Sequence, residues 1–320
     1  MSRSDDPTTP PRRGLGLDAG GTQTRWALAG PAGQLLAQGH VAPIAGAQLA
    51  SDEGRAAVAA ALAQVAVDAA GHGTATGVVA GVTGLGAEHA PLLHALLAQA
   101  FTLPLAAVGS MSDIELACHA AFAPGQGYVV YAGTGSIAAF IDEAGVMHRA
   151  GGRGAVIDDA GGGHWIARQA LRLVWRAEDE APGAWQRSPL ARALFDSLGG
   201  SDWAATRQWV YGATRGELGT LALAVARAAH EGDAAALVLL QDAGAELARL
   251  AVALHRRLGP RPVALAGRVF DLHPAVETAL QSSLQAALPA QIVLQHCAVK
   301  RITLHAHHTA ARLAASQGSP

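Results

Sequence analysis

The sequence predicts an α/β protein built from two similar halves, each of which begins with an antiparallel β-meander. Two glycine-rich turns support this prediction, residues 18–22 (DAGGT) and residues 133–136 (GTGS), because each lies between two apolar runs of strand length. In both halves, segments with alternating strand-like and helix-like patterns follow the meander, as in a sheet covered by helices. Duplicated halves of this kind bind a ligand in the cleft between them.

The length and composition fit two domains with sizeable cores. The chain has 320 residues, which is long for one core, and half of them are apolar. A net charge of −2 argues against a protein that binds nucleic acid or a membrane surface, since both need a basic face. Residues 1–13 contain no hydrophobic centre, so we expect a disordered lead-in and a cytoplasmic protein.

In the first half, we expect the meander to lead into strand–helix units. Glycine-bearing turns separate short apolar runs, and longer alanine-rich stretches follow them. The predicted strands are 14–17, 24–29, 35–40, 76–82 and 105–108, and the predicted helices are 56–70, 90–100 and 114–123.

The second half repeats this order and then becomes mostly helical. The predicted strands are 128–132, 137–141, 262–266 and 291–294; the predicted helical regions are 164–176, 188–260 and a closing helix over 302–317. We expect one domain over 14–117 together with about 301–320, and a second domain over 118–300.

The first turn has the residues needed to bind a phosphate and its metal ion, although a plain hairpin turn would also fit. Gly20 and Gly21 let backbone N–H groups reach an anion, and the Thr22 hydroxyl can donate a hydrogen bond to it. Asp18 would repel a phosphate, but it can hold the hydrated Mg²⁺ that accompanies one.

The lysine, cysteine and histidine residues of this chain do not suggest a lysine-based phosphate site, a disulfide framework or a metal site. Lys300 is the only lysine, so if the chain binds ATP, backbone amides, hydroxyls, Mg²⁺ and arginine must hold it. Arg153 is a candidate, although an arginine in a glycine-rich loop is more often simply exposed. Cys118 and Cys297 are far apart and suggest neither a disulfide framework nor zinc. The tract 305–308 (HAHH) has no acidic or cysteine partner, which favours a solvated helix face over a metal site.

Six motifs in order resemble the N-acetylglucosamine kinase branch of the actin-like, ribonuclease-H-like ATPase superfamily, the BadF/BadG/BcrA/BcrD ATPases. They are DAGGT (18–22), SD (112–113), GTGS (133–136), GGRG (151–154), DDAGGGHWIA (158–167) and VALAG (263–267). The resemblance extends from about residue 14 to residue 313. It implies two ribonuclease-H-like (actin/hexokinase-type) domains with a central cleft, ATP as a substrate and Mg²⁺ as a cofactor.

The resemblance also implies a role for each glycine-rich loop. Asp18 would hold Mg²⁺ through water. The N-terminus of the helix after residues 161–163 could bind an anion, or this glycine run could be a hinge. The residues that would contact ATP and its phosphates are Gly20, Gly21, Thr22, Gly133, Thr134, Gly135 and Gly267.

On the sugar side, Asp113 would be the general base, although an Asp that opens a helix can equally be a cap. Asp159 would bind a sugar hydroxyl, with Thr134 and Thr83 nearby; a buried strand-end hydroxyl is the other interpretation of Thr83. Adjacent residues of an extended backbone point to opposite sides, so Asp158 would be a turn residue.

Four departures from the family pattern lie near the sugar. Arg153 stands for Trp of GGWG, Ala160 and Gly162 stand for Glu and Ser of GDEGS, Ser112 stands for the Asn before the catalytic Asp, and Pro43 stands for a sugar-binding Asn. The motifs therefore support a kinase better than they support one particular sugar.

We therefore expect a kinase that phosphorylates an amino sugar such as N-acetylglucosamine or glucosamine at the 6-hydroxyl. The alternatives are a non-catalytic sugar or nucleotide sensor and a BadF-type ATPase, whose dehydratase-activator form needs cysteines for an iron–sulfur cluster. No nucleic acid or membrane partner is expected, and a homodimer is left open.

Overall fold

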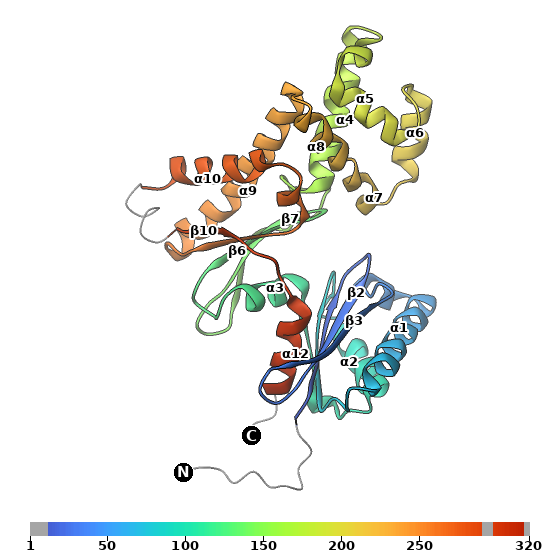
Figure 1. The fold of residues 1–320 in the computed structure, drawn as a ribbon, viewed down its shortest axis with the longest axis vertical. Helices are drawn as coiled ribbons and strands as arrows, with labels where there is room; N and C mark the ends of the chain where they lie inside the picture. Colours follow the sequence, from blue (N-terminus) through green and yellow to red (C-terminus); the bar gives the residue numbers. More distant parts are fainter. Residues whose placement is uncertain (1–11, 290–296, 317–320) are drawn as a thin grey trace. The chain divides into compact units, whose positions relative to one another are not determined.

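The computed structural model describes residues 12–289 and 297–316 (Figure 1). These residues divide into two compact units, one that runs to Ala120 and resumes at Leu304, and one from Ala121 to Thr303. Each unit has its own five-stranded mixed sheet. In the part of the chain that is described, no helix is both long and apolar enough to cross a membrane.

The sheet of the first unit has the order β3-β2-β1-β4-β5. The meander strands are antiparallel, whereas β4 and β5 join β1 in parallel. The strands are β1 (Gly14–Ala19), β2 (Thr24–Ala29), β3 (Leu35–Val41), β4 (Gly77–Val82) and β5 (Val108–Ser112). The expected meander is confirmed.

The fifth strand begins later than the sequence predicted. Leu105–Ala107 is a short 3-10 helix, η2, that follows Pro104, and β5 starts only at Val108. The prediction of a strand over 105–108 was wrong because the strand itself, Val-Gly-Ser-Met-Ser, has few large apolar residues, so the stronger apolar signal came from the preceding turn.

Helices cover both faces of this sheet (Figure 1). Leu15 and Leu17 of β1 belong to the core formed with α1 and α2, while α12 packs on the opposite face. A Cβ at Gly16 would overlap the backbone of α12 at His307 and Ala311, so glycine permits this close approach. The helical elements are η1 (Gly46–Ala50), α1 (Asp52–Ala70), α2 (Ala90–Phe101), α3 (Asp113–Ala121) and α12 (Ala306–Ser316).

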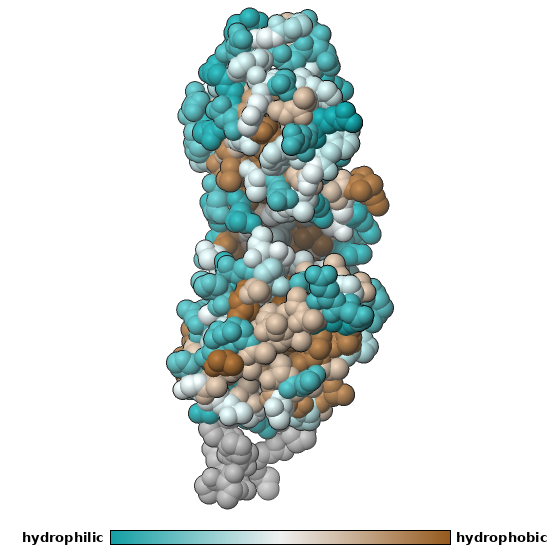
Figure 2. Space-filling model, turned by 90° about the vertical axis from the view of Figure 1, so that its right-hand side faces the viewer, coloured by the Kyte–Doolittle hydropathy of each residue, from teal (hydrophilic) through white to brown (hydrophobic). Residues whose placement is uncertain are grey.

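The outer side of α1 is made largely of alanine. Ser51 caps the start of this helix by accepting a hydrogen bond from Gly54 N at 3.1 Å. Ala56, Ala60 and Ala63 are exposed on its surface, and Figure 2 shows the pale brown of weakly hydrophobic residues interspersed with teal over this unit. Alanine's strong helix propensity explains a stable helix with so few long apolar side chains outside.

The second unit repeats the plan of the first. Its sheet has the order β10-β9-β6-β7-β8, in which β6, β7 and β8 form an antiparallel meander and β9 and β10 pair in parallel. The strands are β6 (Tyr128–Ala132), β7 (Ser136–Ile141), β8 (Met147–Gly151), β9 (Val263–Ala266) and β10 (Val299–Arg301). The sequence did not predict β8 or β10, which are short and have few large apolar residues; the predicted strand at 291–294 lies outside the described residues.

Helices make up most of the rest of this unit, as expected for residues 188–260. The long helix α9 packs on the meander strands and on α10. Asp233 caps α9 by accepting a hydrogen bond from Ala236 N at 2.9 Å. The helical elements are α4 (Gly163–Glu180), η3 (Ala184–Arg187), α5 (Pro189–Leu198), α6 (Trp203–Gly212), α7 (Arg215–Thr220), α8 (Ala222–His230), α9 (Ala234–Leu258), η4 (Arg268–Asp271) and α10 (Pro274–Ala287).

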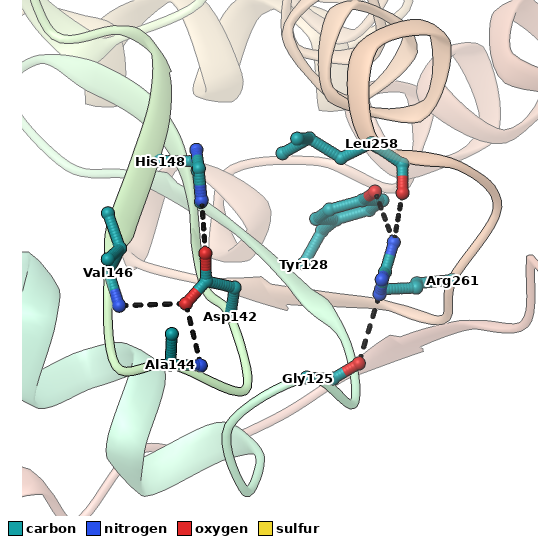
Figure 3. Close-up of polar contacts among 8 residues, drawn as sticks. All are labelled: Gly125, Tyr128, Asp142, Ala144, Val146, His148, Leu258 and Arg261. Atoms are coloured by element: carbon teal, nitrogen blue, oxygen red, sulfur yellow. Dashed lines mark hydrogen bonds and ion pairs between the residues drawn. The ribbon is translucent and has the colours of Figure 1, made fainter.

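Two polar residues secure turns of the second unit (Figure 3). Asp142 accepts hydrogen bonds from Val146 N at 2.8 Å and from the His148 ring at 2.8 Å, and these contacts lower the pKa of its carboxyl. Arg261 makes three hydrogen bonds: it donates to Gly125 O at 3.0 Å, to the buried Tyr128 Oη at 3.2 Å and to Leu258 O.

Loss of the Arg261 guanidinium should therefore destabilise the second unit. We expect Arg261→Gln to lower the free energy of unfolding by about 2–4 kcal/mol, since several charge-assisted hydrogen bonds end on buried or half-buried acceptors. Urea denaturation measures this loss. Arg257→Gln is the control: it removes an exposed arginine that donates to Arg149 O, and a loss equal to that of Arg261→Gln would contradict the assignment.

Candidate active site

In the first unit, parallel pairing brings three strand ends to one edge of the sheet. In the register, Ala19 of β1 lies beside Val82 of β4, and Val82 lies beside Ser112 of β5. The next residues along β4 and β5 are Thr83 and Asp113, and Thr83 N donates to Ala19 O at 2.9 Å. The structure thus gathers residues that lie far apart in the sequence.

The Thr83 hydroxyl donates a hydrogen bond to Asp113 Oδ2, a contact that the sequence did not predict. The other oxygen, Oδ1, accepts from Ile114 N at 2.9 Å. Both side chains are half-buried, so Asp113 has a defined orientation while part of it stays accessible.

The helix cap belongs to the preceding residue. Ser112 Oγ accepts a hydrogen bond from Glu115 N at 3.2 Å, the contact of an N-cap, while Asp113 is the first residue of α3. Ser112 therefore makes the N-cap contact of α3, and Asp113 accepts only the hydrogen bond from the adjacent Ile114 N within this helix.

Asp18 lies at the end of β1, on the same edge. Burial raises the pKa of its carboxyl, Arg25 lowers the pKa, and the neighbouring Asp113 raises it again. Arg25 faces Asp18 directly across the antiparallel β1–β2 pair. Sequence reasoning missed Arg25, although its equal distance from the turn on the returning strand is the signal that could have found it.

The turn after Asp18 exposes its backbone. Gly20 N donates to Gln23 O at 3.2 Å, which closes the turn, and both Gly21 and Thr22 are exposed. A Cβ at Gly21 would meet no protein atom within 4 Å. Packing within the described chain therefore does not explain why residue 21 is a glycine. A glycine at this position would allow a ligand to approach the backbone closely.

In the second unit, the loop between β6 and β7 is bound to the start of α4. Gly163 N donates to Gly133 O at 2.8 Å, and His164 N donates to Thr134 O at 3.0 Å. The expectation that this helix N-terminus is an anion site is therefore wrong for these two amides, because the loop carbonyls occupy them. The Gly133–Thr134 backbone is instead held rigidly in place.

Gly267 follows β9 next to this loop. β9 pairs in parallel with β6, and Tyr131 lies beside Ala266 in the register. Gly267 has φ +102°, and a Cβ there would overlap Ala132 O. Two predicted nucleotide-binding segments, Gly267 and the 133–135 loop, therefore lie side by side, and glycine is sterically required at Gly267.

The adjacent acids Asp158 and Asp159 point to different partners. Asp159 is 4 % exposed, accepts from Gly154 N at 3.2 Å and pairs with Arg215. Asp158, with 29 % of its side chain exposed, pairs with Arg249 at 3.1 Å. Arg215 was not predicted; a Thr-x-x-Glu capping box at residues 214–217 signals its helix, but nothing in the sequence links it to Asp159.

The histidine tract is not the solvated face that the sequence favoured. His305 is exposed and His308 is half-buried, but His307 is only 6 % exposed. Burial, with smaller contributions from His308, Arg25 and His305, lowers the pKa of His307 to about 4. His307 is therefore a buried residue that is neutral at neutral pH.

Residues 15–297 match the model of the BadF/BadG/BcrA/BcrD ATPase family. The chain belongs to this family. A curated relative is the glucosamine kinase GspK of Vibrio cholerae, 27 % identical over 186 residues, which are 58 % of this chain and 60 % of that kinase. The match thus spans less than two thirds of the kinase's length.

Solved structures of the same fold match this family member over nearly the whole chain. A candidate N-acetylglucosamine kinase from Chromobacterium violaceum is 28 % identical, with TM-score 0.71, and the match covers 95 % of this chain and 99 % of that one. One from Porphyromonas gingivalis is 18 % identical, with TM-score 0.70 and coverage of 94 % and 98 %. The two-domain α/β fold predicted from the sequence is confirmed.

The cap assignment gives a test that separates stability from chemistry. Ser112→Ala should lower the free energy of unfolding by about 1 kcal/mol, because α3 loses its N-cap. Asp113→Asn should leave stability nearly unchanged, since an amide oxygen can still accept from Ile114 N. Thermal and urea denaturation measure both variants; a larger loss for Asp113→Asn would return the capping role to Asp113.

Proposed function

We propose that this protein is an ATP-dependent kinase of an amino sugar, glucosamine or N-acetylglucosamine, that transfers the γ-phosphoryl group to the 6-hydroxyl. The observation that supports it most is the Thr83–Asp113 pair at the edge where β1, β4 and β5 end. The family and the glucosamine kinase relative point to the same chemistry. ATP is plentiful in the cytoplasm, where we place the activity.

Asp113 is the proposed general base. Its carboxylate takes the proton of the sugar hydroxyl as the oxygen attacks the phosphorus, and such assistance is worth roughly 10² to 10⁴ in rate. The hydrogen bond from Thr83 fixes the rotamer of Asp113, and Ser112 relieves Asp113 of capping the helix. Thr83 thus contributes by orienting the base as well as by lying near the sugar.

The glycine-rich loops are the proposed phosphate sites. Gly20, Gly21 and Thr22 offer an exposed turn to the β- and γ-phosphates, and the rigid loop that contains Thr134 offers a second one. Gly267 would lie beside the adenine. Developing negative charge on the transferred group would be stabilised by these preorganised donors.

Asp18 fits the Mg²⁺ that accompanies ATP. Its carboxylate is a hard oxygen donor, and burial beside Asp113 raises the pKa of Asp18, so added positive charge there is favourable. The described residues contain no cluster of three or more His, Cys, Asp or Glu side chains arranged for a metal ion; this suits an ion ligated mainly by phosphates and water. When bound, Mg²⁺ supplies positive charge to the phosphate oxygens.

The sensor and dehydratase-activator alternatives have less support. An activator would need cysteine thiolates for its cluster, but Cys118 and Cys297 are both buried, and burial raises the pKa of each thiol, that of Cys118 to about 12. A sensor would have no need for a base oriented by Thr83. The kinase therefore remains the proposal.

A coupled assay of ADP release tests the proposal. Wild-type protein with Mg·ATP should respond to glucosamine or N-acetylglucosamine more than to glucose, N-acetylmannosamine or N-acetylmuramic acid. Asp113→Asn should lower the sugar-dependent turnover by about 10² to 10⁴ while nucleotide still raises the melting temperature.

Two results would contradict this proposal. Turnover of Asp113→Asn equal to that of the wild type would remove Asp113 from the mechanism. If no sugar raises turnover but nucleotide binding persists, the sensor becomes the better interpretation.

The altered sugar loop gives a second prediction. Pro43, exposed in the turn after β3, stands where the family pattern has a sugar-binding Asn. Pro43→Asn should therefore lower the apparent KM for N-acetylglucosamine by about threefold to tenfold, the gain from one hydrogen bond. Pro43→Ala is the control for loss of the proline ring, and equal effects of the two substitutions would contradict the motif alignment.

A further inference from the structure

Two consecutive acids in the 151–163 segment each pair with an arginine, yet the two pairs differ in setting. Asp158 and Arg249 are both accessible, with 29 % and 53 % of their side chains exposed. Asp159 is 4 % exposed, whereas Arg215 keeps 46 % of its side chain accessible. The second pair thus joins a buried carboxylate to a partly accessible guanidinium.

The backbone of Asp159 is also unusual. Its φ is +63°, a conformation that residues other than glycine rarely adopt. Contacts on both sides hold it there: Gly162 N donates to Asp159 O at 3.1 Å, and Gly154 N donates to Oδ1 at 3.2 Å. Strain of this kind persists where the surroundings fix one geometry, and it gathers at functional sites.

The Asp159–Arg215 pair lies against the glycine loop. A Cβ at Gly135 would overlap both Arg215 Nη2 and Asp159 Oδ2, so the absence of a side chain at Gly135 makes room for the pair. The other end of α7 lies near the same loop, because a Cβ built at Gly219 would come to 3.5 Å from Thr134 Cγ2. Both ends of this short helix therefore lie beside the 133–136 loop.

We infer that Arg215 is a positioning residue of the proposed kinase, which holds the Asp159 carboxylate in place beside the Gly133–Gly135 loop. The inference rests on the proposed function and on the role that the family resemblance implies for Asp159, in which its carboxylate accepts a hydrogen bond from a sugar hydroxyl. Removal of Arg215 would leave a buried carboxylate without its ion-pair partner, and such a group turns away or binds water. In each case, Asp159 loses the orientation with which it would bind the sugar.

The test separates sugar binding from nucleotide binding. Arg215→Gln should raise the apparent KM for the amino sugar about tenfold to a hundredfold, the effect of one charge-assisted hydrogen bond, while the KM for ATP changes by less than about threefold. Arg215→Lys should recover most of the loss, because the pair uses a single nitrogen, Nη2, that an ammonium can replace.

Arg249→Gln is the matched control, since it removes the arginine of the neighbouring pair and should leave both KM values unchanged. Asp159→Asn with Arg215→Gln should be no worse than Asp159→Asn alone, because the two residues act through one contact. The comparison of the double variant with Asp159→Asn also tests the role of Arg215 if Arg215→Gln alone fails to fold. The double variant should still fold, because it leaves no uncompensated buried charge.

Three results would overturn the assignment of Arg215: a sugar KM of Arg215→Gln equal to that of Arg249→Gln, no recovery by lysine, or a double variant with a higher sugar KM than Asp159→Asn. These results require an active wild type. A wild-type protein without sugar-dependent turnover would contradict the proposed function itself, and with it the role of Arg215.

Discussion

Parallel strand pairing is the constraint on which both candidate sites depend. In each unit the first strand of the meander is central, and the later strands add to it in parallel, in the orders β3-β2-β1-β4-β5 and β8-β7-β6-β9-β10. Parallel strands end at the same edge of a sheet, so the residues that follow them are neighbours regardless of their separation in the sequence. This geometry brings Thr83 to Asp113 in one unit and Gly267 to the 133–135 loop in the other.

Charge is the second feature that the two units share. Because Lys300 is the only lysine, the positive charge at both candidate sites comes from arginines that lie next to acidic side chains. Arg25 faces Asp18 across two antiparallel strands, and Arg215 pairs with Asp159 beside a glycine loop. Arg153, which the sequence offered as a candidate phosphate ligand, is exposed in the glycine-rich segment. The planar guanidinium suits these positions, because it can contact a carboxylate and still offer donors to an anion.

The sequence predicted the elements whose patterns are strong and local. The meander strands, the helix over 90–100 and the mostly helical region after residue 188 all follow apolar periodicity and glycine-bearing turns, and they are present. β5 was misplaced and β8 was missed because most of their residues are small or polar, so pairing with neighbouring strands decides their conformation more than their own composition does.

Contacts between segments that are distant in the sequence could not be predicted from it. The hydrogen bond from Thr83 to Asp113 and the Asp159–Arg215 ion pair each join residues on separate elements, and no local pattern encodes them. His307 shows the same limit: its tract looks polar, yet the close packing of α12 on Gly16 buries it. The general roles of the motifs were thus predictable, whereas the partners that orient each side chain were not.

The measurement that tests the account most directly is ³¹P NMR of wild-type protein with Mg·ATP and glucosamine or N-acetylglucosamine. A base oriented toward a sugar hydroxyl predicts one new phosphate-ester resonance, which grows in equal amount with ADP and couples to the protons of carbon 6. ADP that accumulates with inorganic phosphate and without the ester would contradict the account, because the γ-phosphoryl group would then pass to water instead of the sugar.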